Sequence, residues 1–244
     1  MADTRSHRGP DPLDGRCFGG EQLPTLQSAN ADLCWLLERG YAEGSALTLV
    51  GNRYSLTARQ RQAVRRSSCS DSARQKRGQC QVLGQRMAGQ RILIDGFNIL
   101  TTAETALGGG VVFLGRDLAM RDIAGLRGTY RPVVETRPAL HAIGRHLVSL
   151  GVKEACWFLD RPVSNSGRLR EIILEEADRL GLAWTVTLES DPDPILAASL
   201  EIIATADSVI LDRCSRWFGL AGAVILAEVP GAWVVDLSGE GAAC

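Results

Sequence analysis

The chain has 244 residues, is 45% hydrophobic, and carries 27 Lys and Arg against 28 Asp and Glu. This length is enough for one large domain or two smaller ones with a well-formed core. No apolar run approaches the roughly 20 residues that cross a bilayer, and the first residues lack the apolar core of a secretory signal. We therefore expect a cytoplasmic protein without a membrane partner.

The near-neutral net charge of −1 is unevenly distributed. Residues 53–91 contain ten Lys or Arg and a single acid, Asp71, whereas the balance from Gly96 onward is negative. A basic segment beside an acidic domain favours a polyanion-binding region joined to a cation-binding site, and a solvated helical surface is the alternative. The seven Cys residues form no C-x-x-C pair, which is typical of a reducing compartment.

Residues 1–24 are rich in Pro and Gly and predict an extended arm. The apolar spacing after Thr25 predicts a helix, and residues 45–50 predict a short helix or strand. A further helix begins at Thr57, where Gln60 completes a capping box. It projects four arginines that we predict to bind nucleic acid: Arg59, Arg61, Arg65 and Arg66. Residues 67–90 predict a mobile connector, so we divide the chain into a basic, mainly helical region, 1–89, and a domain at 90–244.

Apolar, strand-like runs alternate with amphipathic helices throughout residues 90–244. Strands are predicted at 92–94, 111–114, 155–159, 184–188 and 201–205. Helices are predicted at 138–150, 167–180 and 194–200, with an irregular insertion at 116–137 and closing apolar runs at 223–227 and 232–237. This alternation predicts an α/β fold of three αβα layers with a mostly parallel sheet covered on both faces.

Aspartates stand where the predicted strands end. Asp95, Asp160 and Asp207 each follow a strand, and Asp193 begins the helix before the last of them. Because parallel strands bring their carboxyl ends to one edge, we expect these side chains to converge. Clustered carboxylates require a cation, and hard oxygen ligands suit Mg²⁺ or Mn²⁺, which would activate water against a phosphodiester. The alternative is that each Asp caps a helix or turn.

Two stretches resemble a known family. Ile94-Asp95-Gly96-Phe97-Asn98 resembles the first motif of PIN-like and NYN-type metal-dependent nucleases, and residues 192–198 with 204–208 resemble their third and fourth acidic motifs. The resemblance covers about residues 90–237 and implies a PIN-like, Rossmann-like fold, as in an uncharacterised prokaryotic family with a basic N-terminal region. It implies that Asp95, Asp193 and Asp207 bind the metal and that Asn98, Thr205 and Ser208 supply supporting donors.

The remaining ligand stays open at this point. The second acid of the family's site lies on the helix after the first strand, where Glu104, Glu135 and Asp122 compete, and Asp160 is a further candidate. Asp212 either joins the metal site or caps a helix. Ser164, Asn165 and Ser166 precede a helix whose N–H groups would bind phosphate with help from Arg161 and Arg168, and ordinary N-capping is the alternative.

These features together predict metal-dependent phosphodiester hydrolysis, by an endoribonuclease of the PIN-like class that acts on RNA in preference to DNA. The arginines would grip backbone phosphates in a salt-dependent manner. One alternative is a catalytically inactive nucleic-acid-binding regulator on a PIN-like scaffold. Another is a metabolic enzyme that binds a phosphorylated small molecule at residues 164–168, and a homodimer is among the assemblies that we consider.

Overall fold

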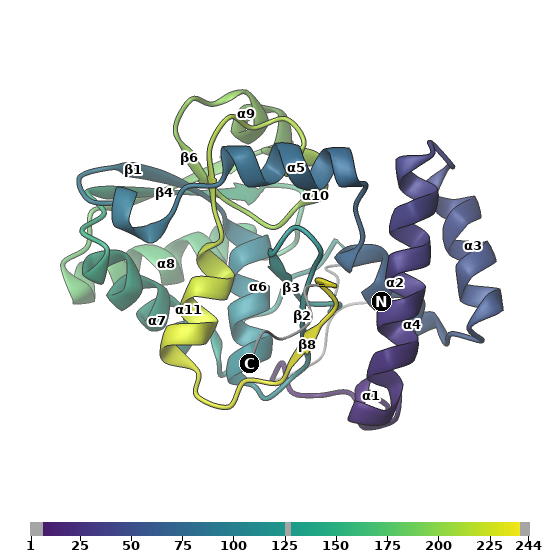
Figure 1. Ribbon diagram of the computed structural model, residues 1–244. Coiled ribbons are helices and arrows are strands. Elements are labelled where there is room, and N and C mark those ends of the chain that lie inside the picture. Colours follow the sequence, from purple (N-terminus) through teal and green to yellow (C-terminus); the bar gives the residue numbers. More distant parts are fainter. Residues whose placement is uncertain (1–6, 125–127, 240–244) are drawn as a thin grey trace.

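The centre of the molecule is a five-stranded parallel sheet. The computed structural model describes residues 7–124 and 128–239 (Figure 1). The strands lie in the order β5-β4-β1-β6-β7, and every pairing between neighbours is parallel. Their bounds are β1 (Arg91–Asp95), β4 (Glu154–Asp160), β5 (Trp184–Glu189), β6 (Ile202–Ala204) and β7 (Trp217–Phe218). The predicted α/β class with a mostly parallel sheet is confirmed.

Successive strands are added first on one side of β1 and then on the other. The chain proceeds from β1 outward to β4 and β5, then returns to the other side of β1 to form β6 and β7. In the pairing of β1 with β6, Ile94 lies opposite Ala204. A reversal of this kind leaves a crevice beyond the carboxyl ends of the two strands, and ligands bind there in doubly wound sheets.

Helices cover both faces of this sheet, as Figure 1 shows. One face packs on α6 (Gly96–Leu107), α7 (Thr136–Ser149), α8 (Ser166–Leu180) and α11 (Leu220–Glu228). The other packs on α9 (Asp193–Ala198) and α10 (Ser208–Leu211). Alternate residues of β1 serve the two faces, with Ile92 and Ile94 in one core and Leu93 in the other. The near-continuous apolar strands therefore reflect burial on both sides.

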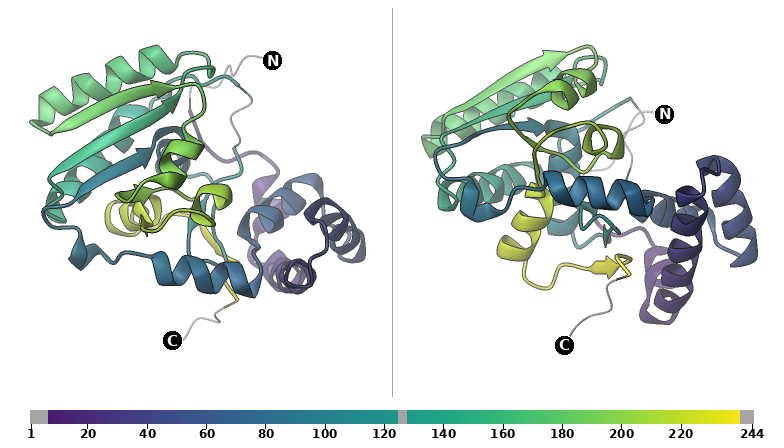
Figure 2. Two further views of the ribbon diagram at one scale, coloured as in Figure 1. Left: turned by 90° about the horizontal axis from the view of Figure 1, so that it is seen from above. Right: turned by 45° about the horizontal axis from the view of Figure 1, so that its top comes forward.

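The N-terminal region is a helical layer beside a second, smaller sheet (Figure 2). Its helices are α1 (Asp14–Phe18), α2 (Leu23–Glu38), α3 (Glu43–Arg53) and α4 (Ala58–Ser67). The small sheet has the order β3-β2-β8, with β2 (Val112–Leu114), β3 (Met120–Arg121) and β8 (Val234–Asp236). Leu33 and Ala63 share one core with Phe113 and Val235. The two parts of the chain thus pack as one body.

The last strand is also tied to the first long helix. The side-chain amides of Gln27 and Asn30 on α2 donate to the carbonyl oxygens of Asp236 (3.1 Å) and Leu237 (2.7 Å). β8 pairs in turn with β2. Residues 232–237, predicted only as an apolar run, therefore close the core of the N-terminal region.

Two predictions for the N-terminal region were wrong. Within the arm predicted at 1–24, of which residues 1–6 lie outside the described residues, residues 14–24 are not extended, because Phe18 is buried in α1 and meets the Phe113 ring edge-on at 4.9 Å. Residues 67–90 are not a mobile connector, since they contain α5 (Asp71–Cys80). Arg77 of α5 is buried and pairs with Asp117 from the 116–137 insertion (2.5 Å). A buried ion pair between segments distant in sequence leaves no periodic signal.

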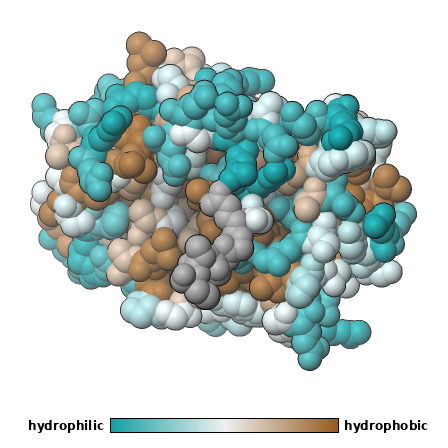
Figure 3. All heavy atoms as spheres, viewed as in Figure 1, coloured by the Kyte–Doolittle hydropathy of each residue, from teal (hydrophilic) through white to brown (hydrophobic). Residues whose placement is uncertain are grey.

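Other local predictions were confirmed. The capping box at Thr57 and Gln60 is present at the start of α4, and residues 45–50 belong to the helix α3. The run at 223–227, predicted only as apolar, lies in the helix α11. On the face shown in Figure 3, hydrophilic side chains lie over α5, and apolar ones gather near α11, where Leu226 is 76% exposed. In residues 7–124 and 128–239, no helix has both the length and the apolar character that crossing a bilayer requires.

Candidate functional site: an acidic cavity at the edge of the sheet

A cavity of about 170 Å³ lies where β1 and β6 end. Four aspartates from four segments line it together with one arginine, Phe97, Asn98 and Thr101. The charged residues are Asp95, Asp122, Asp193, Asp207 and Arg66. Three acids that the sequence placed at strand ends or at a helix start therefore meet at the point where the strand order reverses.

Asp95 is the most deeply placed of these acids and is 8% exposed. Its Oδ2 accepts a hydrogen bond from the Thr205 hydroxyl at 2.7 Å. Burial, together with the charges of Asp207, Asp193 and Asp160, raises the pKa of Asp95 to about 7 against the lowering effect of the Thr205 hydrogen bond. Near neutral pH this carboxyl group is therefore partly protonated.

The segment after β6 is fixed to Asp95 by a short chain of hydrogen bonds. The Thr205 hydroxyl also accepts from the backbone N–H of Asp207 (2.9 Å), and the Asn98 side-chain oxygen accepts from the N–H of Ala206 (2.8 Å). Asp207 caps α10 by accepting from the N–H of Val209 (2.7 Å). Asp207 therefore both lines the cavity and serves as the helix cap that the sequence offered as an alternative.

Asp193 and Asp160 belong to the same electrostatic cluster. Burial raises the pKa of Asp193, and the charges of Asp207, Asp160 and Asp191 add to this effect. Asp160 ends β4 and does not line the cavity, although burial and the charge of Asp191 raise its pKa too. These carboxylates raise one another's pKa values because their negative charges lie close together. Their hydrogen bonds do not fully offset this repulsion.

Asp122 is the fourth acid of the cavity. It follows β3, and its Oδ2 accepts from the hydroxyls of Thr102 (2.9 Å) and Thr101 (3.2 Å) on α6. Its Oδ1 accepts from the N–H of Ala124 (2.6 Å). The sequence indicated three competitors for the second acid, and Asp122 is the one that lies at the cavity. The pairing of β3 with β2 determines the position of Asp122. The sequence around Asp122 has no helical spacing that would have predicted this position.

Glu104 was predicted as a metal ligand and lies elsewhere. It is fully buried near the far end of α6, eight residues beyond Gly96, which at 1.5 Å per residue is about 12 Å along the axis. There it accepts from Tyr130 (2.5 Å), Thr136 (2.6 Å) and Arg8 (3.0 Å). A buried carboxylate needs such partners, and they hold Glu104 away from the cavity.

Three other predicted site residues do not line the cavity either. Asp212 ends α10 and pairs with Arg77 (2.7 Å), which corrects its assignment to the metal site or to a following helix cap. Ser208 begins α10, and its carbonyl oxygen accepts from Arg77 at 3.4 Å. Glu135 accepts from the His7 ring at 2.9 Å. These three residues form contacts between segments that are distant in sequence.

The predicted phosphate-binding segment is largely engaged with main-chain carbonyl groups. Arg161 donates to Leu188 O (2.7 Å), Asn165 to Tyr130 O (2.7 Å), and the Ser166 hydroxyl to Arg161 O (3.2 Å). Asn165 is the N-cap of α8 in a left-handed conformation with φ of 68°, and its side chain does not cap the helix. The cap is therefore neither Ser164 nor Ser166. None of these residues, nor the exposed Arg168, lines the acidic cavity.

The four arginines of α4 have different surroundings. Arg59 pairs with Asp14 (Nε–Oδ1 2.9 Å), and Arg65 pairs with Glu43 (2.8 Å). Arg61 donates to the Asn52 side chain (2.9 Å). For these three, intramolecular pairing on a solvated helix surface accounts for the basic pattern. Arg66 is different, because it lines the acidic cavity.

The cavity is lined by carboxylate and other oxygen atoms, which are the ligand type that divalent cations such as Mg²⁺ prefer. Within the described residues, no three His, Cys, Asp or Glu side chains form a group that could hold a metal ion directly. Mg²⁺ is typically bound through one or two carboxylates and keeps several waters. Asp95, which is buried beside other acids and has a pKa of about 7, fits a site of that type.

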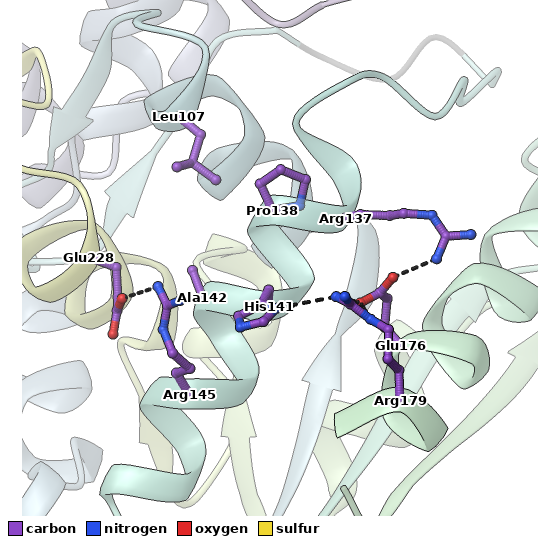
Figure 4. Close-up of a pocket in the computed structure, with 9 residues that line it drawn as sticks. All are labelled: Leu107, Arg137, Pro138, His141, Ala142, Arg145, Glu176, Arg179 and Glu228. Carbon is purple, nitrogen blue, oxygen red and sulfur yellow. Dashed lines mark hydrogen bonds and ion pairs between the residues drawn. The ribbon is translucent and has the colours of Figure 1, made fainter. Parts of the chain in front are cut away.

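A larger pocket of about 570 Å³ lies among the outer helices, and Figure 4 shows its lining. Its charged groups are all engaged in ion pairs: Glu176 pairs with Arg137 and Arg179, and Glu228 pairs with Arg145, each at 2.5 Å. Because each charged side chain of this pocket already has an ion-pair partner, the acidic cavity is the stronger candidate site.

Comparison with known proteins places the chain in a family. Residues 84–223 match the family DUF5616, a domain of unknown function. The chain belongs to the DUF5616 family. Residues 25–79 match DUF434, a protein family of unknown function. "Uncharacterized protein MJ0935" of Methanocaldococcus jannaschii is 29% identical over 187 residues, which are 77% of this chain and 89% of that protein. No solved structure matches the chain.

The two matched regions both contribute to the acidic cavity. Asp95, Asp122, Asp193 and Asp207 lie in the DUF5616 region, whereas Arg66 lies in the DUF434 region. The domain boundary that we expected near Gly89 falls just after the gap between the two matches. The candidate site therefore joins residues from both sides of this boundary.

Proposed function

We propose that this DUF5616 protein is a Mg²⁺- or Mn²⁺-dependent nuclease of the PIN-like class that cleaves RNA. One observation carries the proposal: Asp95, Asp122, Asp193 and Asp207 meet in one cavity at the switch point of a parallel sheet. The resemblance of the motifs around Asp95 and Asp207 to those of PIN-like nucleases also supports the proposal. The proposal keeps the cytoplasmic location, with which the free thiols of the described cysteines are compatible.

The residues of the cavity have separate roles in this proposal. Asp95, Asp193 and Asp207 would hold a hydrated metal ion, in part through its bound waters, and the metal would lower the pKa of water and offset charge on the phosphodiester. Thr205 orients the Asp95 carboxylate through its 2.7 Å hydrogen bond. Asn98 fixes the segment that carries Asp207. Asp122 supplies a further carboxylate whose position Thr101 and Thr102 determine.

A nucleic-acid-binding regulator without catalysis is the second candidate. Asp122 and Asp207 each use one carboxylate oxygen to accept a backbone N–H. Such bonds give both residues a structural reason to be present. In this case the basic N-terminal region would bind backbone phosphates with a strong salt dependence, and the α/β domain would act as a scaffold.

Cleavage of labelled RNA and DNA oligonucleotides with Mn²⁺, Mg²⁺ or EDTA tests the proposal. We expect metal-dependent cleavage of RNA that falls at least 100-fold in Asp95→Asn and Asp193→Asn. Asp178→Asn, an exposed change on α8, is the matched control and should retain the wild-type rate. RNA binding in EDTA without cleavage in either metal would contradict the nuclease and support the regulator.

A further inference from the structure

Arg66 is the one charged residue of the described cavity lining that is not an acid. It lies in the last turn of α4, and its side chain is 38% exposed. Its Nη1 donates to the backbone carbonyl oxygen of Asp122 at 2.6 Å and lies 4.0 Å from the Asp122 carboxylate. The guanidinium is thus held at the cavity by one hydrogen bond to a neutral acceptor and by a long ion pair with Asp122.

Contacts on both sides fix the end of α4 at this place. The Gln62 side chain, one turn before Arg66, donates to Ile123 O at 3.1 Å. The carbonyl oxygen of Ser67 accepts from the N–H of Arg116 at 2.8 Å. The backbone carbonyl groups of Asp122 and Ile123 therefore accept hydrogen bonds from side chains on consecutive turns of α4. The helix and the fourth acid are positioned together.

A cavity lined by four carboxylates repels a phosphodiester unless cations offset its charge. A guanidinium presents five N–H donors in a planar fork that matches two phosphate oxygens. Among the described residues only Nη1 of Arg66 is engaged, so the rest of the fork is available. The chain therefore places a phosphate-binding group beside the acids.

We propose that Arg66 binds the phosphate of the substrate in the acidic cavity, so that the DUF434 region completes the site of the DUF5616 region. This inference rests on the proposed nuclease function. It separates Arg66 from the other arginines of α4, which pair with groups of the N-terminal region itself. The two regions then act as one catalytic unit.

The test compares Arg66→Ala and Arg66→Gln with Arg145→Ala. Arg145 lies on the outer face of α7 and pairs with Glu228, so its removal is a matched loss of one partly exposed arginine. We expect kcat/KM for RNA cleavage in Mn²⁺ to fall at least 100-fold in both Arg66 variants and to change less than twofold in Arg145→Ala. Arg66→Lys should recover part of the loss, since it restores the charge without the fork.

Two further measurements separate phosphate binding from a structural role. In an Asp95→Asn background, Arg66→Gln should weaken RNA binding at least tenfold. Mn²⁺ binding by Arg66→Gln should be unchanged or tighter, because a positive charge has left the cavity. If Arg66→Ala fails to fold, Arg66→Gln, which keeps most of the side-chain stem, decides the question.

The outcomes distinguish this inference from the proposed function. Metal-dependent cleavage by the wild type, with Arg66→Gln as active as Arg145→Ala, would overturn the role of Arg66 and leave the nuclease intact. A loss of Mn²⁺ binding in Arg66→Gln would also overturn it, since the arginine would then support the acids. A wild type that does not cleave RNA with any metal would overturn both proposals.

Discussion

Replacing Asp95 by Asn should change how the stability of the protein depends on pH. Asp95 is buried beside other acids, and its pKa is raised from 3.8 to about 7. Between pH 3.8 and about pH 7, Asp95 is protonated in the folded protein and ionised in the unfolded chain. Stability therefore falls as pH rises through this window and is constant, for this group, above about pH 7 and below pH 3.8.

The magnitude follows from about 1.4 kcal/mol per pKa unit. Between pH 5 and pH 8 only the part of the window up to pH 7 contributes, so ionisation of Asp95 costs the wild type about 3 kcal/mol of stability. Asn does not ionise, and its side-chain oxygen can still accept from Thr205. The stability of Asp95→Asn should therefore not fall in this way. Comparing the change in unfolding free energy between the two pH values removes any pH-independent difference between the two proteins.

Urea unfolding at pH 5 and pH 8, in EDTA to exclude bound cations, measures the effect. From pH 5 to pH 8 we expect the wild type to lose about 3 kcal/mol more than Asp95→Asn does. Asp178→Asn, on the exposed face of α8, should follow the wild type. Parallel pH dependence of the wild type and Asp95→Asn would refute the reasoning, because it would mean that Asp95 titrates alike in the folded and unfolded chains.

Three further substitutions test the contacts around the site. Arg77→Met removes a buried partner of Asp117, and urea unfolding should show a loss of about 3–5 kcal/mol; a loss below about 1 kcal/mol would contradict the buried pair. Thr205→Val removes the donor to Asp95, so the pKa of that carboxyl, followed by NMR, should rise; an unchanged value would contradict the role of this bond. Gly96→Ala would place a Cβ 2.9 Å from Phe158 O and should cost about 1–3 kcal/mol in thermal unfolding, whereas a neutral effect would contradict this close approach.

Much of the sheet could be predicted from the sequence, because apolar runs alternate with amphipathic helices and each run ends in a polar residue. Asp95, Asp193 and Asp207 were placed correctly at one edge, since parallel strands align their carboxyl ends. The roles of these acids as metal ligands remain predictions. Thr205 donates to Asp95, as a supporting donor would, whereas the Asn98 side-chain oxygen accepts from the N–H of Ala206.

The remaining features depend on tertiary contacts that local patterns do not encode. Asp122 reaches the cavity through a two-residue strand in a segment that looked irregular, and Glu104 is drawn away by Tyr130 and Thr136. The stretch around Arg77 appeared to be a connector because its polar composition hides a buried pairing with Asp117. Sequence composition reports the charge of a residue but not whether the fold supplies a partner.

The attachment of β8 to α2 has a consequence for how the two ends of the chain depend on each other. β8 lies beyond both regions matched by known families, yet Gln27 and Asn30 bind its last carbonyl groups and Val235 fills the core beneath α2 and α4. The C-terminal strand thus holds the helices α2 and α4 in place. Proteolytic removal of residues after Gly231 should loosen α4 and withdraw Arg66 from the acids while the parallel sheet stays folded.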